Sequence, residues 1–273
     1  MHFERFHPAR ALVLISILCA ALATGCATSP DQEEELAEFE DVNDPLESLN
    51  RGIFEFNRFA DGILIKPLAL MYRTFIPPEV RRGTRNFLEN LRTPVTLAND
   101  LMQGKMERAG NTIGRFVINS TVGIGGVMDM ADRFGMEGHR EDFGQTLAVW
   151  GTGEGFYLML PLFGPSNPRD VIGLVADAFL DPLSYVLDDD ILATRTVVRG
   201  VDERESVIDT LDEIERTSLD FYATLRSLYR QRRDDEIRDG APAPLIPIPS
   251  ISIKDFEDFE EFEEDGHKVS LVN

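Results

Sequence analysis

The chain has 273 residues, a formal net charge of −21 and only two cysteines. A charge this negative argues against nucleic acid as a partner, and equally against electrostatic adsorption to anionic lipid. Any attachment to a membrane must therefore come from covalent lipid or from buried apolar surface.

The first 25 residues have the features of a secretory signal. Arg5 and Arg10 precede the apolar run 11–23, which is too short to span a bilayer. The small residues before Cys26 resemble the lipobox of bacterial lipoprotein signals, with Leu22 one place early. We therefore predict that residues 1–25 are removed and that Cys26 is the lipid-attachment residue, the alternative being an ordinary signal with an accidental cysteine. Removal takes Cys19 away, so no internal disulfide can form.

Two acidic segments flank the predicted folded domain, residues 43–240. Residues 26–42 are predicted to be an acidic tether between the lipid anchor and the domain, because acidic runs without bases are usually solvated. Residues 241–273 combine a proline-rich spacer with an acidic, disordered tail. Phenylalanines at every third position in that tail, Phe256, Phe259 and Phe262, leave a helical docking motif as the alternative.

Apolar residues at helical spacing predict helices through the first half of the domain. Asp44, Pro45 and Glu47 have the arrangement of a capping box, and the apolar stripe continues to Ile63. Pro67, the Pro77-Pro78 pair and Pro94 predict breaks, which would leave helical pieces at 67–76, 78–92 and 94–103. Another amphipathic helix is predicted over 105–121, ending at Gly123.

The second half contains a glycine-rich turn between further predicted helices. Residues 142–150 suit a short helix, and Gly151, Gly153 and Gly155 suit a turn before the apolar segment 156–163, a strand or a buried extended segment. Helix returns over 169–180. From Val197 onward two long, charged helices are predicted, with Thr217 and Asp220 offering a cap between them. The domain should be mainly α-helical.

The helices leave two arrangements open. No apolar run outside the signal reaches the roughly 18 residues of a spanning helix. Short, proline-bounded helices rich in Phe, Met and Leu suit a protein that lies in one leaflet of a membrane. The same composition also suits a compact soluble helical domain that hangs from a lipid.

Residues typical of catalysis or cofactor binding are not visible. His139 and His267 have no nearby cysteine or second histidine, so no metal site is predicted. Two glycine clusters occur, Gly123-x-Gly125-Gly126 and Gly151-x-Gly153-x-Gly155. Neither has the Gly-Lys-Ser/Thr ending of a phosphate-binding loop, and no G-x-S-x-G elbow occurs. We predict no cofactor and no enzymatic activity.

The domain resembles the MlaA (VacJ) family of outer-membrane lipoproteins, which help to keep phospholipid out of the outer leaflet. The resemblance rests on blocks in a fixed order: Asp44-Pro45-Leu46-Glu47, Asn50-Arg51, Phe56-Asn57, Asn86-Phe87, Asn90-Leu91 with Pro94, Gln103-Gly104, Arg115-Phe116, Asn119 through Gly126 with Asp129, Phe143 through Leu147, Gly151-x-Gly153-x-Gly155-x-Tyr157, Leu160-Pro161, Arg169-Asp170 and Asp181-Pro182. One departure is Arg58, which interrupts an aromatic and asparagine repeat of the family.

The resemblance implies a ring-like, mainly helical plate in the inner leaflet of the outer membrane of a Gram-negative bacterium, facing the periplasm. An amphipathic central channel would pass misplaced outer-leaflet phospholipid to a periplasmic carrier of the Mla type, and family members associate with trimeric porins. The loop Gly151–Gly155 with Tyr157 corresponds to a flexible hairpin beside the channel, and the helix carrying Phe56 and Asn57 borders the pathway. Asn119, Gly123, Gly125 and Gly126 would form a rigid frame.

Three functions therefore stand side by side. The first is a passive lipid conduit that serves retrograde transport and outer-membrane lipid asymmetry. The second is a structural lipoprotein that scaffolds a porin or envelope complex without moving lipid. The third, an envelope phospholipid hydrolase, is disfavoured by the missing nucleophile constellation.

Overall fold

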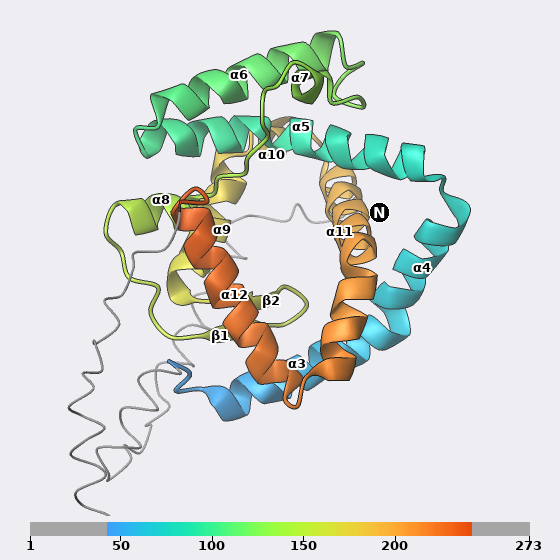
Figure 1. The fold of residues 1–273 in the computed structure, drawn as a ribbon, viewed down its shortest axis with the longest axis vertical. Helices are drawn as coiled ribbons and strands as arrows, with labels where there is room; N and C mark the ends of the chain where they lie inside the picture. The colour runs from blue at the N-terminus through green and yellow to red at the C-terminus, as the bar shows by residue number, and fades with distance from the viewer. Residues whose placement is uncertain (1–42, 242–273) are drawn as a thin grey trace, which may run out of the picture.

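The computed structural model describes residues 43–241. The predicted signal, Cys26, the acidic tether and the acidic tail lie outside the described residues. Figure 1 shows helices arranged as a ring-like plate around a central opening, into which a β-hairpin projects. The mainly α-helical fold predicted from the sequence is confirmed.

The first arc of the ring is one nearly continuous helical path. It consists of α3 (Glu47–Ala60), the π-helix η1 (Asp61–Ile65) and α4 (Lys66–Phe75). The helical piece predicted at 67–76 is α4, but the π-helical turn joins it to α3 without a gap. Pro67 lies in the first turn of α4, where a missing N–H costs little, and the wider π-helical turn precedes it.

The capping box predicted at Asp44 is wrong. Leu46 is the N-cap of α3 and makes no side-chain cap. The buried Asp44 carboxylate instead accepts hydrogen bonds from the Asn50 amide at 2.7 Å and from the Tyr222 hydroxyl, and it pairs with Arg226 at 2.8 Å. The Asp44 carboxylate is therefore bound by Asn50, Tyr222 and Arg226 and does not cap the N-terminus of α3.

The next side of the ring is an antiparallel helix pair, α5 (Pro78–Met102) and α6 (Met106–Thr121). The predicted break at Pro94 does not occur, since α5 is a single helix of 25 residues that includes Pro94. Proline removes one backbone hydrogen bond there. Packing of α5 against α6, α9 and α11 holds the helix on both sides of that position.

Short elements lead from this pair to the hairpin. They are α7 (Met130–Arg133) and α8 (Phe143–Val149), whose N-cap Asp142 accepts from the Gln145 amide. The strands β1 (Leu158–Leu160) and β2 (Gly164–Ser166) pair antiparallel, with Met159 opposite Pro165. The predicted extended segment 156–163 therefore forms the first strand and the turn of the hairpin.

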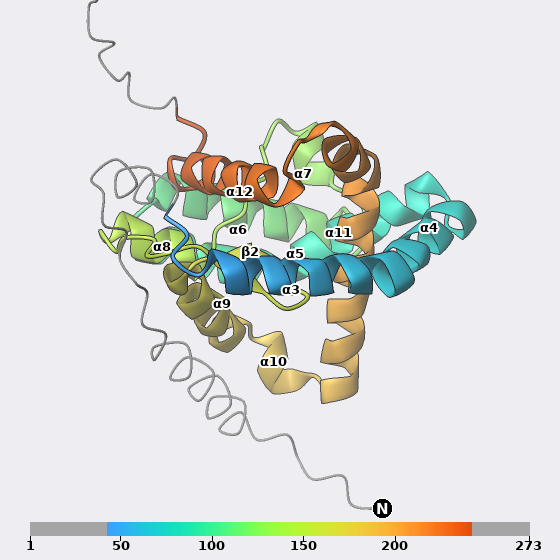
Figure 2. The ribbon, with the colours of Figure 1, turned by 90° about the horizontal axis from the view of Figure 1, so that it is seen from below.

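The C-terminal helices cross the ring and extend to both sides of it. After α9 (Pro168–Leu180) come α10 (Leu183–Val186), α11 (Asp189–Thr217) and α12 (Phe221–Ile237). Seen from below the ring, α10 and the adjoining end of α11 protrude on one side, and α12 lies on the other (Figure 2). The helix predicted from Val197 starts eight residues earlier, because Asp189 and Asp190 suit a helix N-terminus. Asp220, not Thr217, caps α12.

A small aromatic core fixes the hairpin to α3 and α12. The Tyr222 ring lies edge-on to Phe54 and to Tyr157, with centroids 5.5 and 6.0 Å apart, and Met159 completes the cluster. Edge-to-face aromatic pairs add stabilisation beyond the area that they bury. The hairpin is thereby positioned from both sides of the ring.

Candidate functional site

A central cavity of about 1020 Å³ lies in the opening of the ring. This volume is at the upper end of the roughly 300–1,000 Å³ typical of small-molecule sites. Its walls come from α3 and η1, α5, the hairpin, α11 and α12. Segments from the whole length of the described chain thus meet around one space.

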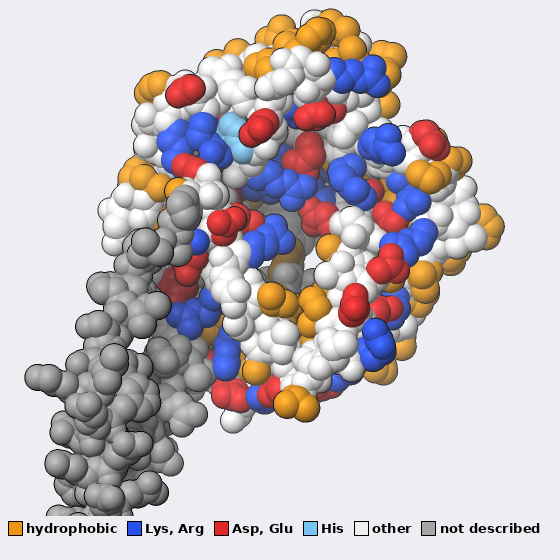
Figure 3. Space-filling view, viewed as in Figure 1, with side chains coloured by type: hydrophobic (Ala, Val, Ile, Leu, Met, Phe, Trp, Pro, Cys, Tyr) orange, Lys and Arg blue, Asp and Glu red, His pale blue; other side chains and the backbone are white. Residues whose placement is uncertain are grey.

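The lining of the central cavity is divided by polarity. Apolar side chains come mainly from α3, the hairpin and α12: Phe54, Phe59, Met159, Leu162, Phe163, Phe221 and Leu225. Charged side chains come mainly from α5 and α11 and include Arg85, Glu89, Arg199, Asp202 and Arg204. The division is incomplete, since charged residues also come from α3, η1, α4 and α12 and apolar ones from α5 and α11, among them Glu55, Arg58, Asp61, Lys66, Arg232, Leu88, Val207 and Leu211. The space-filling view shows this division, with hydrophobic side chains below the central hollow and charged ones above it (Figure 3). Such a space suits a molecule with one polar and one apolar end.

Asn57 joins α3 to the tip of the hairpin. Its amide nitrogen donates to the Leu160 carbonyl at 2.9 Å, and its amide oxygen accepts from the Leu162 N–H at 2.7 Å. Leu162 has φ 65°, a left-handed conformation that a leucine rarely adopts, so these two bonds stabilise an otherwise unfavourable turn. Asn57 and Leu162 both line the central cavity, as the sequence led us to expect for Asn57.

The neighbouring Phe56 does not line the central cavity. Its side chain is 52% exposed and belongs to the outer side of α3. Arg58, where the sequence departs from the family resemblance, does line the cavity, and it pairs with Glu215 of α11 at 2.5 Å. The helix α3 thus contributes Phe54, Glu55, Asn57, Arg58 and Phe59 to the cavity, so its face toward the cavity mixes aromatic, amide and charged side chains.

Gly151–Gly155 form the loop between α8 and β1, and the turn of the hairpin lies later, at residues 161–163. Gly151 and Gly155 have positive φ values of 92° and 76°, whereas a side chain at Gly153 would meet open space. Asn43 anchors the end of the loop, since its amide donates to the Gly155 carbonyl at 2.6 Å. None of these glycines is among the residues that line the central cavity.

Tyr157 is a core residue. It is 3% exposed, packs on Tyr222 and Tyr229, and its N–H donates to the Asn43 carbonyl at 2.9 Å. Burial, followed by the nearby Asp44 charge, raises the pKa of its hydroxyl well above the ordinary value. Tyr157 thus positions the hairpin from below without facing the cavity.

The turn that contains Gly123, Gly125 and Gly126 packs tightly against the end of α6. The Asn119 amide oxygen accepts from the N–H groups of Met130 and Ala131 at 2.8 and 2.9 Å, and its nitrogen donates to Asp129 at 3.0 Å. A β-carbon at Gly123 would overlap the carbonyl oxygens of Met128 and Asn119. The turn therefore requires glycine and leaves little room for movement.

Ion pairs hold α11 against the first arc of the ring. Lys66 and Arg204 bind Asp212 and Asp61 at 2.8 Å each, and Arg85 binds Asp202 at 2.9 Å. Glu205, which is buried, is shared by Arg73, Arg81 and Arg85. Most of the charged wall of the central cavity is thus neutralised internally.

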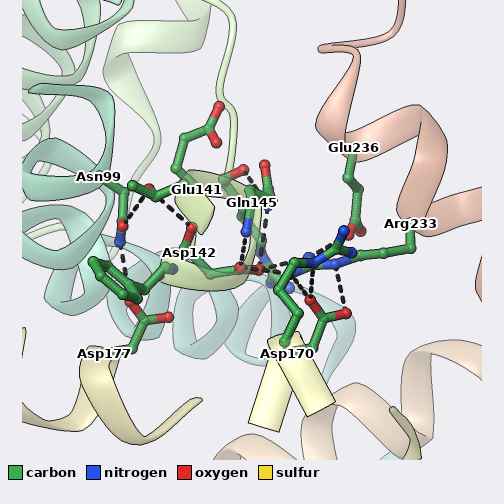
Figure 4. A network of polar contacts seen from close by, with 12 residues as sticks. Asn99, Glu141, Asp142, Gln145, Asp170, Asp177, Arg233 and Glu236 are labelled. Carbon is green, nitrogen blue, oxygen red and sulfur yellow. Dashed lines mark hydrogen bonds and ion pairs between the residues drawn. The ribbon is translucent and has the colours of Figure 1, made fainter. Parts of the chain in front are cut away.

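A second polar network lies outside the central cavity and joins α5, α8, α9 and α12 (Figure 4). Arg233 binds both Asp142 and Asp170, at 2.6 and 2.8 Å. Burial opposes ionisation of Asp142, but the Arg233 hydrogen bonds and charge outweigh it and lower its pKa to about 2. Asp177, in the same network, has its pKa raised to about 6 by burial, despite hydrogen bonds from Asn99 and Phe143.

The fold brings His139 close to two buried carboxylates that the sequence did not connect with it. One ligand atom each from Asp100, His139 and Glu141 falls within 4.8 Å of the others. Lys105 and Arg108 already pair with Glu141, at 3.4 and 2.9 Å. A metal ion would compete with two cations there, so this cluster is better described as an ion-pair network.

The outer rim of the ring is apolar. Among the described residues, exposed large hydrophobic side chains far outnumber buried ones and include Phe56, Ile63, Met71, Phe75, Phe116, Val117, Phe134, Phe179 and Val186. Hydrophobic side chains gather along much of the outer edge of the ring (Figure 3). Exposed apolar patches of this extent mark a contact with membrane or protein. Within residues 43–241, no helix has the length and apolarity needed to cross a bilayer.

An apolar rim around an amphipathic cavity agrees with the comparisons to known proteins. Residues 42–236 match the MlaA lipoprotein family. The chain belongs to this family. The family resemblance inferred from the ordered sequence blocks is thereby confirmed, and MlaA is a family of transport lipoproteins associated with the outer membrane.

Relatives of the MlaA family cover most of the chain. The intermembrane phospholipid transport system lipoprotein MlaA of Escherichia coli is 32% identical over 221 residues, 80% of this chain and 85% of that protein. Its counterpart from Haemophilus influenzae is 30% identical over 233 residues, 84% of this chain and 91% of that protein. An uncharacterised protein of Rickettsia bellii is 35% identical over 199 residues, 72% of this chain and 78% of that one.

A solved MlaA-like structure has the same fold. It is described as the structural basis for maintenance of bacterial outer membrane lipid asymmetry. It superposes with a TM-score of 0.65 and 34% sequence identity, and covers 71% of this chain and 98% of that chain. The ring of helices in Figure 1 is thus an architecture that occurs in a protein of the same envelope process.

Proposed function

We propose that this protein removes mislocalised phospholipid from the outer leaflet of the outer membrane through the central cavity. The lipid then passes to a periplasmic carrier of the Mla type for retrograde transport, which maintains the lipid asymmetry of the membrane. The observation that carries this proposal is the combination of an apolar outer rim with a cavity divided into charged and apolar walls.

The two surfaces suit the two parts of the task. An apolar rim can lie among acyl chains in the inner leaflet, with a lipidated Cys26 as an additional anchor. Inside the ring, a headgroup can follow the charged wall while the acyl chains lie on Phe59, Leu162 and Phe163. No bond is made or broken in such transport, so the protein acts without catalysis and without a cofactor or metal.

The glycine clusters have different roles in this proposal. Gly151, Gly153 and Gly155 let the loop before the hairpin change shape, so that the hairpin tip can move at the mouth of the cavity. Asn119, Gly123, Gly125 and Gly126 form the rigid frame. A trimeric porin, contacted through part of the apolar rim, would hold the ring in position, and the segments 26–42 and 241–273 would act as tether and tail of the domain 43–240.

The proposal is tested by the lipid content of the outer leaflet in cells with the wild-type protein, without it, and with Gly153→Pro. Proline is placed at Gly153 because Gly151 has a positive φ, which proline cannot adopt without backbone strain. Cells that lack the protein should accumulate phospholipid in the outer leaflet, and Gly153→Pro should reproduce part of that effect.

Two results would contradict the proposal at different levels. An unchanged outer leaflet in cells without the protein would favour a scaffold that binds porin without moving lipid. Normal asymmetry with Gly153→Pro, at a normal protein level, would remove the loop from the mechanism and leave the conduit intact.

A further inference from the structure

Arg199 differs from the other cations of the central cavity. Each of the others is paired with a carboxylate: Arg58 with Glu215, Lys66 with Asp212, Arg85 with Asp202, Arg140 with Glu89, Arg204 with Asp61 and Arg232 with Glu236. Arg199 forms no ion pair with any residue that the structure describes. Its one hydrogen bond goes to the Leu88 carbonyl, at 3.3 Å.

The surroundings of Arg199 are unfavourable for an isolated cation. The side chain is only partly exposed, on the face of α11 that lines the cavity. Burial, and then the charges of Arg92 and Arg195, lower the pKa of its guanidinium from the ordinary value. Arg92 and Arg195 each pair with a carboxylate, Asp177 at 3.8 Å and Asp181 at 2.7 Å. The carboxylates whose charges favour the ionised form of Arg199, Glu203 and Glu89, both pair with Arg140.

An unpaired, partly buried guanidinium is destabilising unless an anion binds it. The planar fork of arginine matches the oxygen atoms of a phosphate group and can bind two of them at once.

The opposite wall of the cavity indicates what else the anion carries. Phe59, Leu162 and Phe163, all exposed, form an apolar surface in the same space. A free phosphate ion would leave this surface in contact with water. An amphiphile with a phosphate at one end and acyl chains at the other would cover both walls.

We infer that Arg199 binds the phosphate group of a phospholipid inside the central cavity, with the acyl chains directed toward the hairpin. This inference rests on the proposed function and adds to it a defined contact for the headgroup. It makes Arg199 a binding residue that no motif in the sequence singled out.

The test compares two ligands with the same short acyl chains, dihexanoyl phosphatidylethanolamine and dihexanoylglycerol. Full-length lipidated protein, stripped of bound lipid in a non-ionic detergent, is titrated with each, and with inorganic phosphate, by calorimetry. Arg199→Gln should lower the affinity for the phospholipid about ten-fold or more, because a charge-assisted contact is lost, and leave dihexanoylglycerol unchanged. Arg199→Lys should fall between the two, since lysine contacts phosphate as a single point charge.

The matched control is Arg73→Gln, which removes the same charge outside the cavity. Arg73 pairs with Glu205 and Asp209, so its loss should lower the melting temperature and leave phospholipid affinity unchanged. Arg199→Gln should melt at or above the wild-type temperature without lipid, since it removes an unpaired charge.

The outcomes separate the inference from the proposed function. If the wild-type protein binds no phospholipid, the proposed function fails. If it binds phospholipid and Arg199→Gln binds equally well, only the inference is overturned. Loss of affinity for both lipids together with a lower melting temperature would show that Arg199 supports the cavity walls, and would overturn it too. Arg199-dependent binding of inorganic phosphate without phospholipid binding would overturn the lipid assignment.

Discussion

At the scale of single residues, glycine at position 123 is required by contact rather than by flexibility. A β-carbon there would overlap two backbone oxygens, which cannot rotate away as a side chain can. Gly123→Ala should therefore lower the free energy of unfolding by about 2 kcal/mol or more. Gly110→Ala is the control, because Gly110 lies in α6 with open space around it and alanine should add roughly 0.5–1 kcal/mol. Urea unfolding in one detergent measures both; equal effects would show that the frame is not tightly packed.

Asp177 makes stability depend on pH in a direction unusual for a carboxylate. Its pKa is about 6 in the folded protein, above the roughly 3.9 of an unfolded chain. Between these values the folded state binds more protons, so the contribution of Asp177 is fully present below pH 4 and is lost as the pH rises through 6. Asp177→Asn should match the wild type at pH 4 and exceed it by about 1–3 kcal/mol at pH 7.5.

Asp142→Asn, in the same network, is the control of opposite sign (Figure 4). Its pKa is lowered to about 2, so its contribution is present above the unfolded value and is lost as the pH falls through 2. This variant should be less stable than the wild type at pH 7.5, and the difference should shrink toward pH 3. Unfolding curves at pH 3, 4 and 7.5 test both predictions. A gain in stability for Asp177→Asn that is equal at pH 4 and 7.5 would show that the pKa of Asp177 is not raised in the folded protein.

At the scale of elements, the sequence predicted those whose cause is local. The stripes of α3 and α6, the short helix α8 and the end of α9 before Asp181 all follow from spacing and neighbouring residues. The errors concern places where distant residues decide. Packing carries α5 through Pro94, and Tyr222 and Arg226 take Asp44 away from its helix.

The residues of the candidate site were likewise only partly predictable from the sequence. Asn57 was singled out from the sequence and lies at the cavity, next to the hairpin. Phe56 and Tyr157 were expected at the channel as well, but Phe56 is exposed away from the cavity and Tyr157 is buried. Both outcomes depend on how α3 and the hairpin are oriented in the assembled ring. Arg199 could not be found from spacing, since its lack of a carboxylate is a property of the assembled ring.

The turn of the hairpin depends on the side chain of Asn57. Its two strands have three residues each, and two-stranded hairpins of this size are only marginally stable alone. Asn57→Ala removes both bonds at the turn, so hydrogen exchange over residues 160–163 should become about ten-fold faster or more, with little change in global unfolding.

Asn111→Ala is the matched control for the hairpin, because Asn111 also joins its helix to a loop, by donating to the Glu137 carbonyl at 2.7 Å. It should leave exchange at 160–163 unchanged. Mass spectrometry of peptides from both variants gives the comparison. Unaltered exchange at the turn in Asn57→Ala would mean that the aromatic core alone fixes the hairpin.

At the scale of the whole molecule, the apolar rim predicts how the ring lies in a bilayer. Phe75 at the end of α4 and Phe116 on α6 are 73% and 40% exposed, and α4 and α6 form part of the outer circumference of the ring (Figure 1). Leu219 is fully exposed in the turn between α11 and α12, and this turn lies on the side of the ring where α12 lies (Figure 2). If the ring is embedded in one leaflet, the two phenylalanines contact acyl chains and Leu219 contacts water.

Tryptophan fluorescence can separate these positions, because the chain has a single tryptophan, Trp150. In a Trp150→Phe background, Phe75→Trp and Phe116→Trp should be quenched by brominated acyl chains in reconstituted vesicles, and Leu219→Trp by aqueous acrylamide. The physical reason is that burying large aromatic side chains in hydrocarbon is favoured at about 25 cal/mol per Å² of apolar surface. Equal acrylamide quenching at all three positions would place the domain in water, hung from its lipid anchor, and the apolar rim would then have to be covered by a protein partner.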